Sequence, residues 1–442
     1  MQQKRTRRTF MKETAGIGVG VWVGGSVMGA DESKSPNERI RFACIGIGGK
    51  GDSDSADAGK RGDVVAICDI DEKRLATASE KKFPNAKVYT DYRKMLEEMG
   101  DSIDAVTVST PDHNHAMASV LAMRAGKHCF TQKPLTHSVQ EARMMADEAR
   151  KAKVATQMGN QGTANDSLRK AAAIVRSGAL GTIKEVHVWT NRPVWPQGGP
   201  RPKPASQIPS HIHWEQWIGP APFRDYAPGY HPFAWRGWWD FGTGALGDMA
   251  CHTFNMPFMA LDLMNPTSIV AEHAGHNGDS YPAWSVITFQ FPATESRPAI
   301  PVTWYDGGKK PTSAVFGSDN VPKSGVLIVG DKDTLHGHGD YCGGLNLLSG
   351  NEPPQVEYTK SPGHFDEFTR AIRGGEPAVS NFPDYAGPLT ETILLGNLAV
   401  WCGKSPTSDG KEVKWDATNL KATGMPELDA IIRPENRKGW EL

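Results

Sequence analysis

From Arg39 to Met158, short apolar runs alternate with segments whose apolar residues recur at helical spacing. Short apolar runs are typical of buried strands, and apolar residues at every third or fourth position are typical of helices that pack on one face. The predicted strands are Ile40–Ile45, Val64–Cys68, Ile103–Ser109, Lys127–Phe130 and Val154–Met158, with a weaker one around Val88. The predicted helices are Asp71–Lys81, Tyr92–Met99, His113–Ala125 and Ser138–Ala152. This alternation predicts an α/β fold with a doubly wound parallel sheet.

The pattern changes from about Gly162 onward, where strand-like stretches follow one another without regular helices between them. These stretches are Ile183–Asn191, Ile269–His273, Trp284–Phe291, Val302–Trp304 and Val326–Val329. They predict an open, mostly antiparallel sheet in a second, α+β domain. Near the C-terminus, His364–Ile372 and Leu389–Trp401 have helical patterns, and we expect both helices to cover this second sheet.

Charge and composition argue against several classes of protein. The 442 residues carry 49 Lys and Arg against 50 Asp and Glu, without the basic surplus that nucleic-acid-binding proteins use. No apolar run in the sequence reaches the roughly 18 residues of a membrane-spanning helix. The six cysteines lack the spacing of a metal site, and the pairs His113/His115 and His336/His338 each lack a third spaced ligand. We therefore expect a protein that binds neither nucleic acid nor a metal ion, and that has no membrane span in its mature form.

The N-terminal residues have the features of an export signal. Arg7 and Arg8 stand in the basic stretch Thr6–Lys12, an apolar stretch follows over residues 15–27, and small residues come next. The paired arginines followed by Phe-Met-Lys resemble the twin-arginine (Tat) signal, whose machinery exports proteins that are already folded. We expect residues 1–30 to be a Tat signal that directs the protein to the periplasm or otherwise out of the cytoplasm, with any cofactor bound beforehand.

A glycine-rich turn closes the first predicted strand. Its residues are Gly46, Ile47, Gly48, Gly49, Lys50 and Gly51. A GxGxxG turn between a strand and a helix lets the backbone approach a dinucleotide pyrophosphate, and the helix N-terminus then faces the phosphates. Asp69 ends the second strand, where a carboxylate binds the ribose hydroxyls of NAD and repels the 2′-phosphate of NADP. Asp69 therefore favours NAD, although the nearby basic residues Lys73 and Arg74 leave NADP open. We predict a Rossmann domain over residues 31–160 that binds NAD or NADP.

Two further motifs follow the fourth and fifth predicted strands. Thr110–His115 reads Thr-Pro-Asp-His-Asn-His, and Ala-Gly-Lys-His at 125–128 leads to Gln132-Lys133-Pro134. In this order the motifs resemble those of the Gfo/Idh/MocA oxidoreductases (glucose–fructose oxidoreductase and inositol dehydrogenase among them), whose last motif is Glu-Lys-Pro. Gln132 keeps the hydrogen-bonding capacity of that glutamate but removes its charge from beside Lys133.

The resemblance implies an NAD(P)-dependent oxidoreductase whose second domain, here residues 161–442, binds the substrate and forms oligomers. Besides the glycine turn and Asp69, it implies cofactor contacts from Ser109, Thr110, Pro111, His115, Gln132, Lys133 and Asn160.

The segment Gly244–His252 opens a helix in the second domain. Asp248 and His252 are four residues apart and share one face of that helix. From the residues alone, a capping aspartate and a core histidine are the simpler interpretation. The resemblance implies instead that both face the nicotinamide together with Lys133. His252 then accepts the hydroxyl proton of the substrate, Lys133 hydrogen-bonds the reacting oxygen, and Asp248 orients His252.

Seven of the thirteen tryptophans lie between Trp189 and Trp239, in a segment rich in proline and glycine. Flat aromatic faces suit the apolar face of a sugar ring, although we expect about half of these rings to pack in the core. The candidate substrate contacts are Arg192, Trp195, Arg236, Trp239 and Asn255, the last at a position where the family pattern has Asp. A carbohydrate is therefore the expected class of substrate.

Together these features predict an exported NAD(P)-dependent oxidoreductase of a sugar, polyol or glycoside. Soluble NAD(H) is scarce outside the cytoplasm, so we expect a tightly bound cofactor and a redox-neutral cycle. Two alternatives stay open: a glycoside hydrolase or lyase that oxidises its substrate transiently, and a non-catalytic nucleotide- or sugar-binding protein. Members of the family often pair through the outer face of the second sheet, which implies a homodimer or homotetramer.

Overall fold

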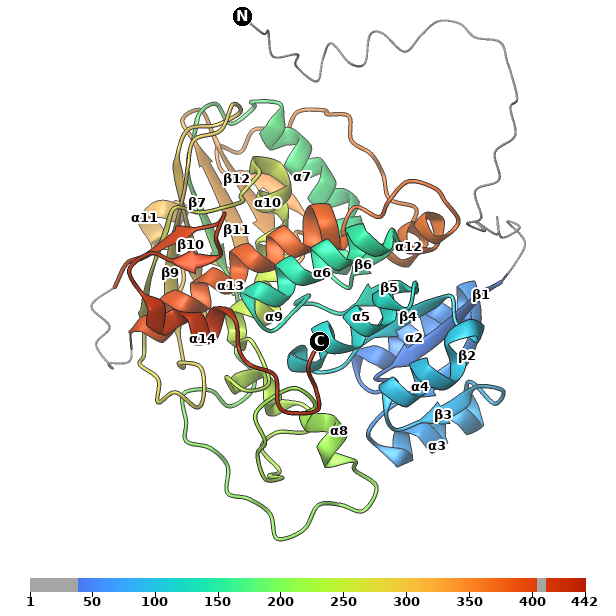
Figure 1. Ribbon diagram of the computed structural model, residues 1–442. Helices are drawn as coiled ribbons and strands as arrows, with labels where there is room; N and C mark the ends of the chain where they lie inside the picture. Colours follow the sequence, from blue (N-terminus) through green and yellow to red (C-terminus); the bar gives the residue numbers. More distant parts are fainter. Residues whose placement is uncertain (1–38, 404–410) are drawn as a thin grey trace, which may run out of the picture. The chain divides into compact units, whose positions relative to one another are not determined.

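A computed structural model describes residues 39–403 and 411–442, and it contains two β-sheets with helices packed on them (Figure 1). This mixed α/β architecture is the predicted fold class. The predicted export signal lies outside the described residues. In the described ranges, no helix is both long enough and apolar enough to cross a membrane.

The first sheet has six parallel strands in the order β3-β2-β1-β4-β5-β6, which confirms the doubly wound arrangement. Its strands are β1 (Ile40–Ile45), β2 (Gly62–Cys68), β3 (Lys87–Tyr89), β4 (Ala105–Val108), β5 (His128–Thr131) and β6 (Thr156–Met158). Its connecting helices are α2 (Lys50–Arg61), α3 (Glu72–Lys81), α4 (Tyr92–Met99), α5 (His115–Arg124) and α6 (Val139–Ala152). The chain order reverses between β1 and β4, and ligands of such sheets bind at that point, beyond the carboxyl ends of the strands.

Local sequence explains where several of these helices begin. The Asp71 side chain accepts hydrogen bonds from the backbone N–H groups of Lys73 and Arg74, which starts α3. Ser138 and Glu141 form a reciprocal capping box at the start of α6. These caps satisfy backbone donors that the first helical turn leaves without a partner.

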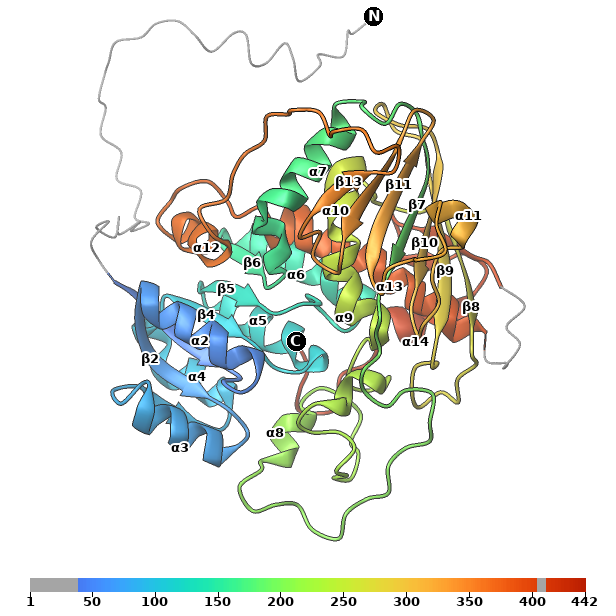
Figure 2. The same cartoon turned by 180° about the vertical axis from the view of Figure 1, so that it is seen from behind.

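The second sheet has nine strands in the order β13-β12-β11-β7-β10-β9-β8-β14-β15. Its strands are β7 (Ile183–Trp189), β8 (Ser268–His273), β9 (Ser285–Phe291), β10 (Ile300–Tyr305), β11 (Gly325–Gly330), β12 (Thr334–His338), β13 (Leu345–Leu347), β14 (Val413–Asp416) and β15 (Lys421–Ala422). All neighbouring strands are antiparallel except β7 and β10, so the predicted open, mostly antiparallel sheet is confirmed. Figure 2 shows this sheet from the side opposite to Figure 1.

Helix α13 (Gly387–Cys402) joins the two parts, because it packs on α6 beside the first sheet and on β8 and β9 of the second. It is buried on nearly all sides, as expected for a helix between two layers. The predicted helix His364–Ile372 exists as α12, but the expectation that it covers the second sheet is wrong. Phe365 packs on Phe130 of β5, with ring centroids 5.0 Å apart, so α12 covers the first sheet.

Two segments of irregular backbone extend from the second part to the first. The excursion, residues 190–243 between β7 and α9 (Gly244–Thr253), contains the short helix α8 (Trp214–Ile218) and touches the first sheet beyond β2. There the backbone N–H of His213 donates to the carbonyl of Ile70 at 2.9 Å. The C-terminal tail, residues 433–442, follows α14 (Asp429–Ile432) and also reaches the first part (Figure 1). Both segments contribute to the site.

Candidate active site

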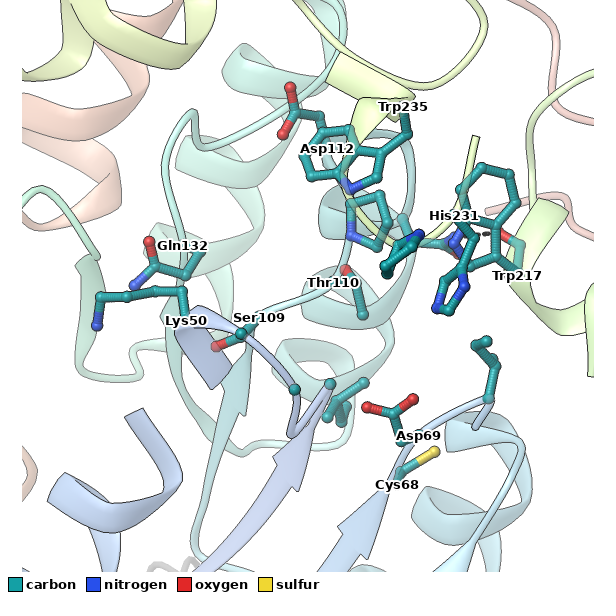
Figure 3. Close-up of a pocket in the computed structure, with 18 of the residues that line it drawn as sticks. Lys50, Cys68, Asp69, Ser109, Thr110, Asp112, Gln132, Trp217, His231 and Trp235 are labelled. Carbon is teal, nitrogen blue, oxygen red and sulfur yellow. Dashed lines mark hydrogen bonds between the residues drawn. The ribbon is translucent and has the colours of Figure 1, made fainter. Parts of the chain in front are cut away.

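A cavity of about 410 Å³ lies where the carboxyl ends of β1, β2, β4 and β5 meet helix α9 and the excursion. Its wall includes Gly46, Asp69, Thr110 and Lys133 from the strand ends and His252 from α9. Figure 3 shows Asp69 and Ser109 on the strand ends of the first sheet, with Trp217, His231 and Trp235 entering from the excursion. The cavity therefore lies at the switch point of the first sheet, where dinucleotides bind in this class of fold.

The glycine turn is packed so tightly that side chains are excluded at two of its positions. A Cβ atom on Gly46, whose φ is 75°, would lie 2.6 Å from the carbonyl oxygen of Ser109. A Cβ atom on Gly51 would lie 1.9 Å from the carbonyl oxygen of Gly46. Helix α2 begins directly after Gly49 without a side-chain cap, and Gly49 and Lys50 line the cavity. The N-terminus of the helix is therefore open to an anion in the cavity.

Asp69 holds the turn as well as facing the cavity. Its carboxylate accepts hydrogen bonds from the backbone N–H of Ile47 at 2.9 Å and of Asp71 at 3.0 Å. Burial raises the pKa of Asp69, while these bonds and the positive charge of Arg74 act in the opposite direction. The guanidinium of Arg74 lies over Gly48 and lines the cavity, so of the two basic residues noted after β2 it is Arg74 that faces the ligand site.

A buried carboxylate, Asp54 in the second turn of α2, connects three residues of the wall. It accepts from the Gln132 side-chain amide at 2.9 Å and from the Ser109 hydroxyl at 2.8 Å, and it forms an ion pair with Lys50. Its exposed fraction is 2%. Gln132 is thus a donor to a carboxylate, which is a role that glutamate could not fill while ionised. The sequence contained no sign of this contact, because the two residues are far apart in the chain.

Lys133 forms an ion pair with Asp248 at the opposite side of the cavity. The Lys133 ammonium donates to Oδ1 and to the backbone oxygen of Asp248, both at 2.8 Å, and Arg236 Nε donates to the same Oδ1 at 3.1 Å. Burial alone raises the pKa of Asp248, but the charges and hydrogen bonds of Lys133 and Arg236 outweigh it and bring the pKa to about 2. Asp248 is therefore an anion throughout the physiological range.

His252 follows one turn later on α9 and also lines the cavity. Its ring packs against Tyr341 at a centroid distance of 4.6 Å, and its Nδ1 has no hydrogen-bond partner among the described residues. Burial, and then the nearby charge of Lys133, hold the pKa of His252 well below 6.5, so the ring is neutral. We expected Asp248 to orient His252, but the Asp248 carboxylate forms ion pairs with Lys133 and Arg236 instead. Asp248 therefore positions Lys133.

Asp112 is a further acidic group of the wall to which the sequence analysis gave no role. Its exposed fraction is 3%, and its Oδ2 accepts a hydrogen bond of 2.7 Å from the Thr243 hydroxyl at the start of α9. Burial raises the pKa of Asp112 to about 7, although Arg236 and Lys133 favour the anion. A carboxyl group that titrates near neutrality in a cavity is suited to proton transfer.

Several predicted contacts lie outside the wall that the described residues form. His115 bridges the carbonyl oxygens of Pro134 and Thr110, both at 2.8 Å, and so holds the loops after β4 and β5 together. Asn160 is buried and accepts from Ser380, and Asn255 donates to Thr163 at 2.8 Å. Both asparagines thus have structural partners rather than cavity contacts. Ile47 and Gly51 shape the glycine turn from beneath it.

Of the five candidate substrate contacts, Arg236 lines the cavity. Arg192 lies 4.0 Å from Asp340, Trp195 is buried beside Arg236, and Trp239 faces a second, smaller cavity. Six of the seven tryptophans of this stretch are buried, more than expected, and Trp217 and Trp235 among them also form part of the wall. The sequence analysis missed wall residues that distant segments supply: Gln161, His231, Phe233, Tyr341 and Trp440.

The described residues contain no group of three or more His, Cys, Asp or Glu side chains that could hold a metal ion. The six cysteines are free thiols, five of them buried. Burial raises the pKa of the Cys251 thiol, which lies in α9 between Asp248 and His252, to about 12, so it is not a nucleophile near neutral pH. Of the side chains in the cavity wall, the Lys133 amine, the His252 imidazole and the Asp112 carboxyl group are suited to proton transfer.

Two family models match the chain, and they describe the two domains of one family. The oxidoreductase family, NAD-binding Rossmann fold, matches residues 40–160, and the oxidoreductase family, C-terminal alpha/beta domain, matches residues 164–295. Together they cover more than half of the 442 residues.

Curated relatives match over shorter stretches. A glycosyl hydrolase family 109 protein of Solibacter usitatus is 30% identical over 154 residues, which are 31% of this chain and 35% of the relative. A second such protein, of Shewanella sp. strain ANA-3, is 33% identical over 172 residues, 36% of each chain. A myo-inositol 2-dehydrogenase of Thermotoga maritima is 26% identical over 159 residues, 36% of this chain and 47% of the relative. The matched stretch thus spans between about a third and a half of each relative.

Solved structures share the fold over most of the chain. The WlbA dehydrogenase of Bordetella pertussis, in complex with NADH and UDP-GlcNAcA, has a TM-score of 0.59 at 18% identity and covers 86% of this chain and 99% of its own. An aldose–aldose oxidoreductase of Caulobacter crescentus, complexed with glycerol, has a TM-score of 0.57 at 17% identity and covers 86% of this chain and 100% of its own. With both family models matched in sequence and the glycine turn, Asp69 and Lys133 around one cavity, the chain belongs to the Gfo/Idh/MocA family of NAD-dependent oxidoreductases.

Proposed function

We propose that this protein oxidises a hydroxyl group of a carbohydrate with NAD that stays bound throughout the cycle, and that it works after export from the cytoplasm. The observation that carries the proposal is a single cavity whose wall contains the dinucleotide turn, Lys133 and His252, with Lys133 held by its ion pair to Asp248. A sugar or polyol as substrate is supported by the myo-inositol 2-dehydrogenase relative and by the fold shared with an aldose–aldose oxidoreductase.

The residues around the cavity fit NAD. Gly46 and Gly48 allow close backbone approach, the open N-terminus of α2 suits the pyrophosphate, and Asp69 faces the cavity where a ribose would lie. When bound, NAD supplies a hydride acceptor for a carbinol carbon and a hydride donor for the reverse reaction. Arg74 in the wall keeps a 2′-phosphate compatible with the same site.

Lys133 is placed to bind the reacting oxygen. An ammonium group has three N–H donors, and Asp248 takes two of those of Lys133. The third can donate to a substrate hydroxyl in the cavity and can stabilise the negative charge that develops on its oxygen. Because Asp248 stays ionised, it also keeps the ammonium in one position.

His252 accepts the proton that leaves the hydroxyl group. Its imidazole is neutral, so it has a lone pair for that proton, and the cavity wall brings it beside Lys133. Burial and the nearby ammonium both disfavour the imidazolium, so the neutral ring is the form present before the reaction.

A second candidate function is cleavage of a glycoside through transient oxidation. The observation that favours it is the identity of 30–33% with two glycosyl hydrolase family 109 proteins. Oxidation of a ring hydroxyl acidifies the neighbouring C–H, loss of that proton expels the aglycone, water adds to the resulting double bond, and the hydride removed first is returned last. Asp112, whose pKa is raised to about 7 by burial, is suited to protonate the leaving group.

Export and cofactor retention support each other in this proposal. The Tat-like residues Arg7 and Arg8 would carry a folded protein past the membrane with its nucleotide in place. Outside the cytoplasm, a cycle continues only if each turnover returns the cofactor to its starting oxidation state. Both candidate functions meet this condition, the first by oxidising one sugar and reducing another.

The test is a panel of aldoses, polyols and nitrophenyl glycosides, offered to purified protein while the absorbance of reduced nicotinamide is followed. Sugar oxidation predicts that a single aldose or polyol leaves the bound nicotinamide reduced until a second sugar is added. Glycoside cleavage predicts release of nitrophenol without net reduction. Full activity in both Lys133→Ala and His252→Ala, or no reaction with any member of the panel, would contradict the proposal.

A further inference from the structure

The C-terminal tail places an aromatic ring in the wall of the cavity. Trp440 is 5% exposed and lines the cavity next to Thr90 and Tyr92, at the ends of β3 and the start of α4. The Arg93 guanidinium lies 3.7 Å from the centroid of the Trp440 ring, and Tyr92 meets that ring edge-on at 6.1 Å. Trp440 thus belongs to a wall whose first residue in the chain is Ile45.

Hydrogen bonds hold the tail to both neighbouring segments. Arg437 donates from its backbone to the carbonyl of Pro220 at 2.9 Å and from Nε to the carbonyl of Gly219 at 3.0 Å, and it pairs with Glu215. Arg93 donates to the carbonyl of Gly439 at 3.2 Å. The tail is therefore attached to the excursion on one side and to the start of α4 on the other.

The position of Trp440 relates it to one half of the cofactor. In a doubly wound sheet, the acid after β2 binds the ribose of the adenosine half, and the pyrophosphate crosses the glycine turn. The wall residues Thr90 and Tyr92 follow β3, on the Asp69 side of that turn, whereas Lys133 follows β5 on the other side. Trp440 thus lies at the adenosine end of the cavity, away from the reacting groups.

We infer that Trp440 is a cofactor-positioning residue that encloses the adenosine end of the site, and that the tail retains the bound nucleotide. Arg93 covers one face of the indole ring, the opposite face can stack on a base, and the anchors at Arg437 and Arg93 keep the ring in place. Neither family model reaches the tail, since the second one ends at residue 295. The inference rests on the NAD-binding part of the proposed function and explains how the cofactor persists through the cycle.

The experiment measures the rate at which NADH leaves the purified full-length protein, from the loss of its fluorescence when excess NAD is added. Trp440→Ala is expected to raise that rate roughly 10- to 100-fold, the range that loss of one base–aromatic contact produces. Trp440→Phe should keep most of the retention. Lys438→Ala, an exposed position of the same tail, is the matched control and should release NADH at the wild-type rate.

Arg437→Gln provides a second variant that loosens the tail without altering the cavity wall, and it should also release NADH faster. An unchanged release rate in Trp440→Ala and Arg437→Gln would overturn the inference, as would wild-type protein that exchanges NADH as fast as Trp440→Ala. Faster release in protein that oxidises no carbohydrate would support the tail's role and contradict the proposed function. Carbohydrate oxidation by a protein whose NADH release rate does not depend on Trp440 would support the proposed function and contradict the role of the tail.

Discussion

The side-chain amide of Gln132 donates a hydrogen bond of 2.9 Å to Asp54, a carboxylate buried in the second turn of α2. The family pattern has glutamate at the position of Gln132. In this protein the negative charge lies instead on Asp54, where Lys50 and Ser109 also contact it. Lys133, the neighbour of Gln132, pairs with a different carboxylate, that of Asp248. Glutamine in place of the family's glutamate at position 132 therefore removes a negative charge from beside Lys133, while the ion pair of Lys133 with Asp248 is retained.

Gln132→Glu should destabilise this protein, although it restores the family residue. Two carboxylates about 3 Å apart cannot both ionise, so one must stay protonated. The loss in thermal unfolding temperature should be greater at pH 8 than at pH 5, where protonation costs less. The double variant Gln132→Glu/Asp54→Asn, which exchanges the two groups, should recover much of the loss. An equal loss at both pH values would contradict this account of Gln132.

The ion pair of Lys133 and Asp248 should be needed for both stability and activity, and variants can separate the two. Lys133→Met leaves a buried carboxylate with Arg236 as its remaining partner and should cost about 3 kcal/mol in the free energy of unfolding. Lys133→Met/Asp248→Asn removes both charges and should recover part of that loss. Neither variant should regain carbohydrate oxidation. Activity in the stable double variant would show that Lys133 is structural.

Asp112 should make the stability of the protein depend on pH in a defined direction. Its pKa is raised to about 7 in the folded state, so the fold favours the protonated form. The stabilisation is complete below the unfolded pKa of about 4 and is lost as the pH rises toward 7. The unfolding temperature of the wild type relative to Asp112→Asn should therefore fall between pH 4 and pH 7. A constant difference over that range would mean that Asp112 does not titrate there.

Sequence periodicity was sufficient for most of the first sheet, because β2, β3, β4 and β5 are each followed by a helix whose apolar residues recur at helical spacing. The polar helix α2 after β1 was indicated by the glycine turn instead. The spacing of the glycines between a predicted strand and a helix was also sufficient to locate the glycine turn and Asp69, because these residues lie close together in the sequence. Periodicity assigned α12 to the wrong sheet, because an apolar face on a helix does not specify which surface it covers. Asp54, Asp112 and Trp440 could not be placed in the site, since their partners are distant in the sequence. Most of the tryptophans between Trp189 and Trp239 proved to be core residues. Composition alone cannot distinguish such residues from aromatic rings that stack on a sugar.

Export is tested independently of the chemistry. Replacement of both Arg7 and Arg8 by lysine should leave the precursor in the cytoplasm, because the export receptor reads the arginine pair. Fractionation of cells that express the wild type and the double variant measures this directly. Wild-type secretion of the variant would remove the Tat assignment, and with it the argument from scarce external NAD(H).

The central claim is that the protein turns over carbohydrate on a nucleotide that stays bound from one turnover to the next. The direct measurement is sustained turnover by protein gel-filtered free of loose nucleotide, with the sugar and glycoside panel and no added NAD(P). The account predicts many turnovers per protein molecule, with bound nicotinamide detected by mass spectrometry before and after the reaction. Activity that disappears on gel filtration and returns only with stoichiometric external cofactor would contradict it.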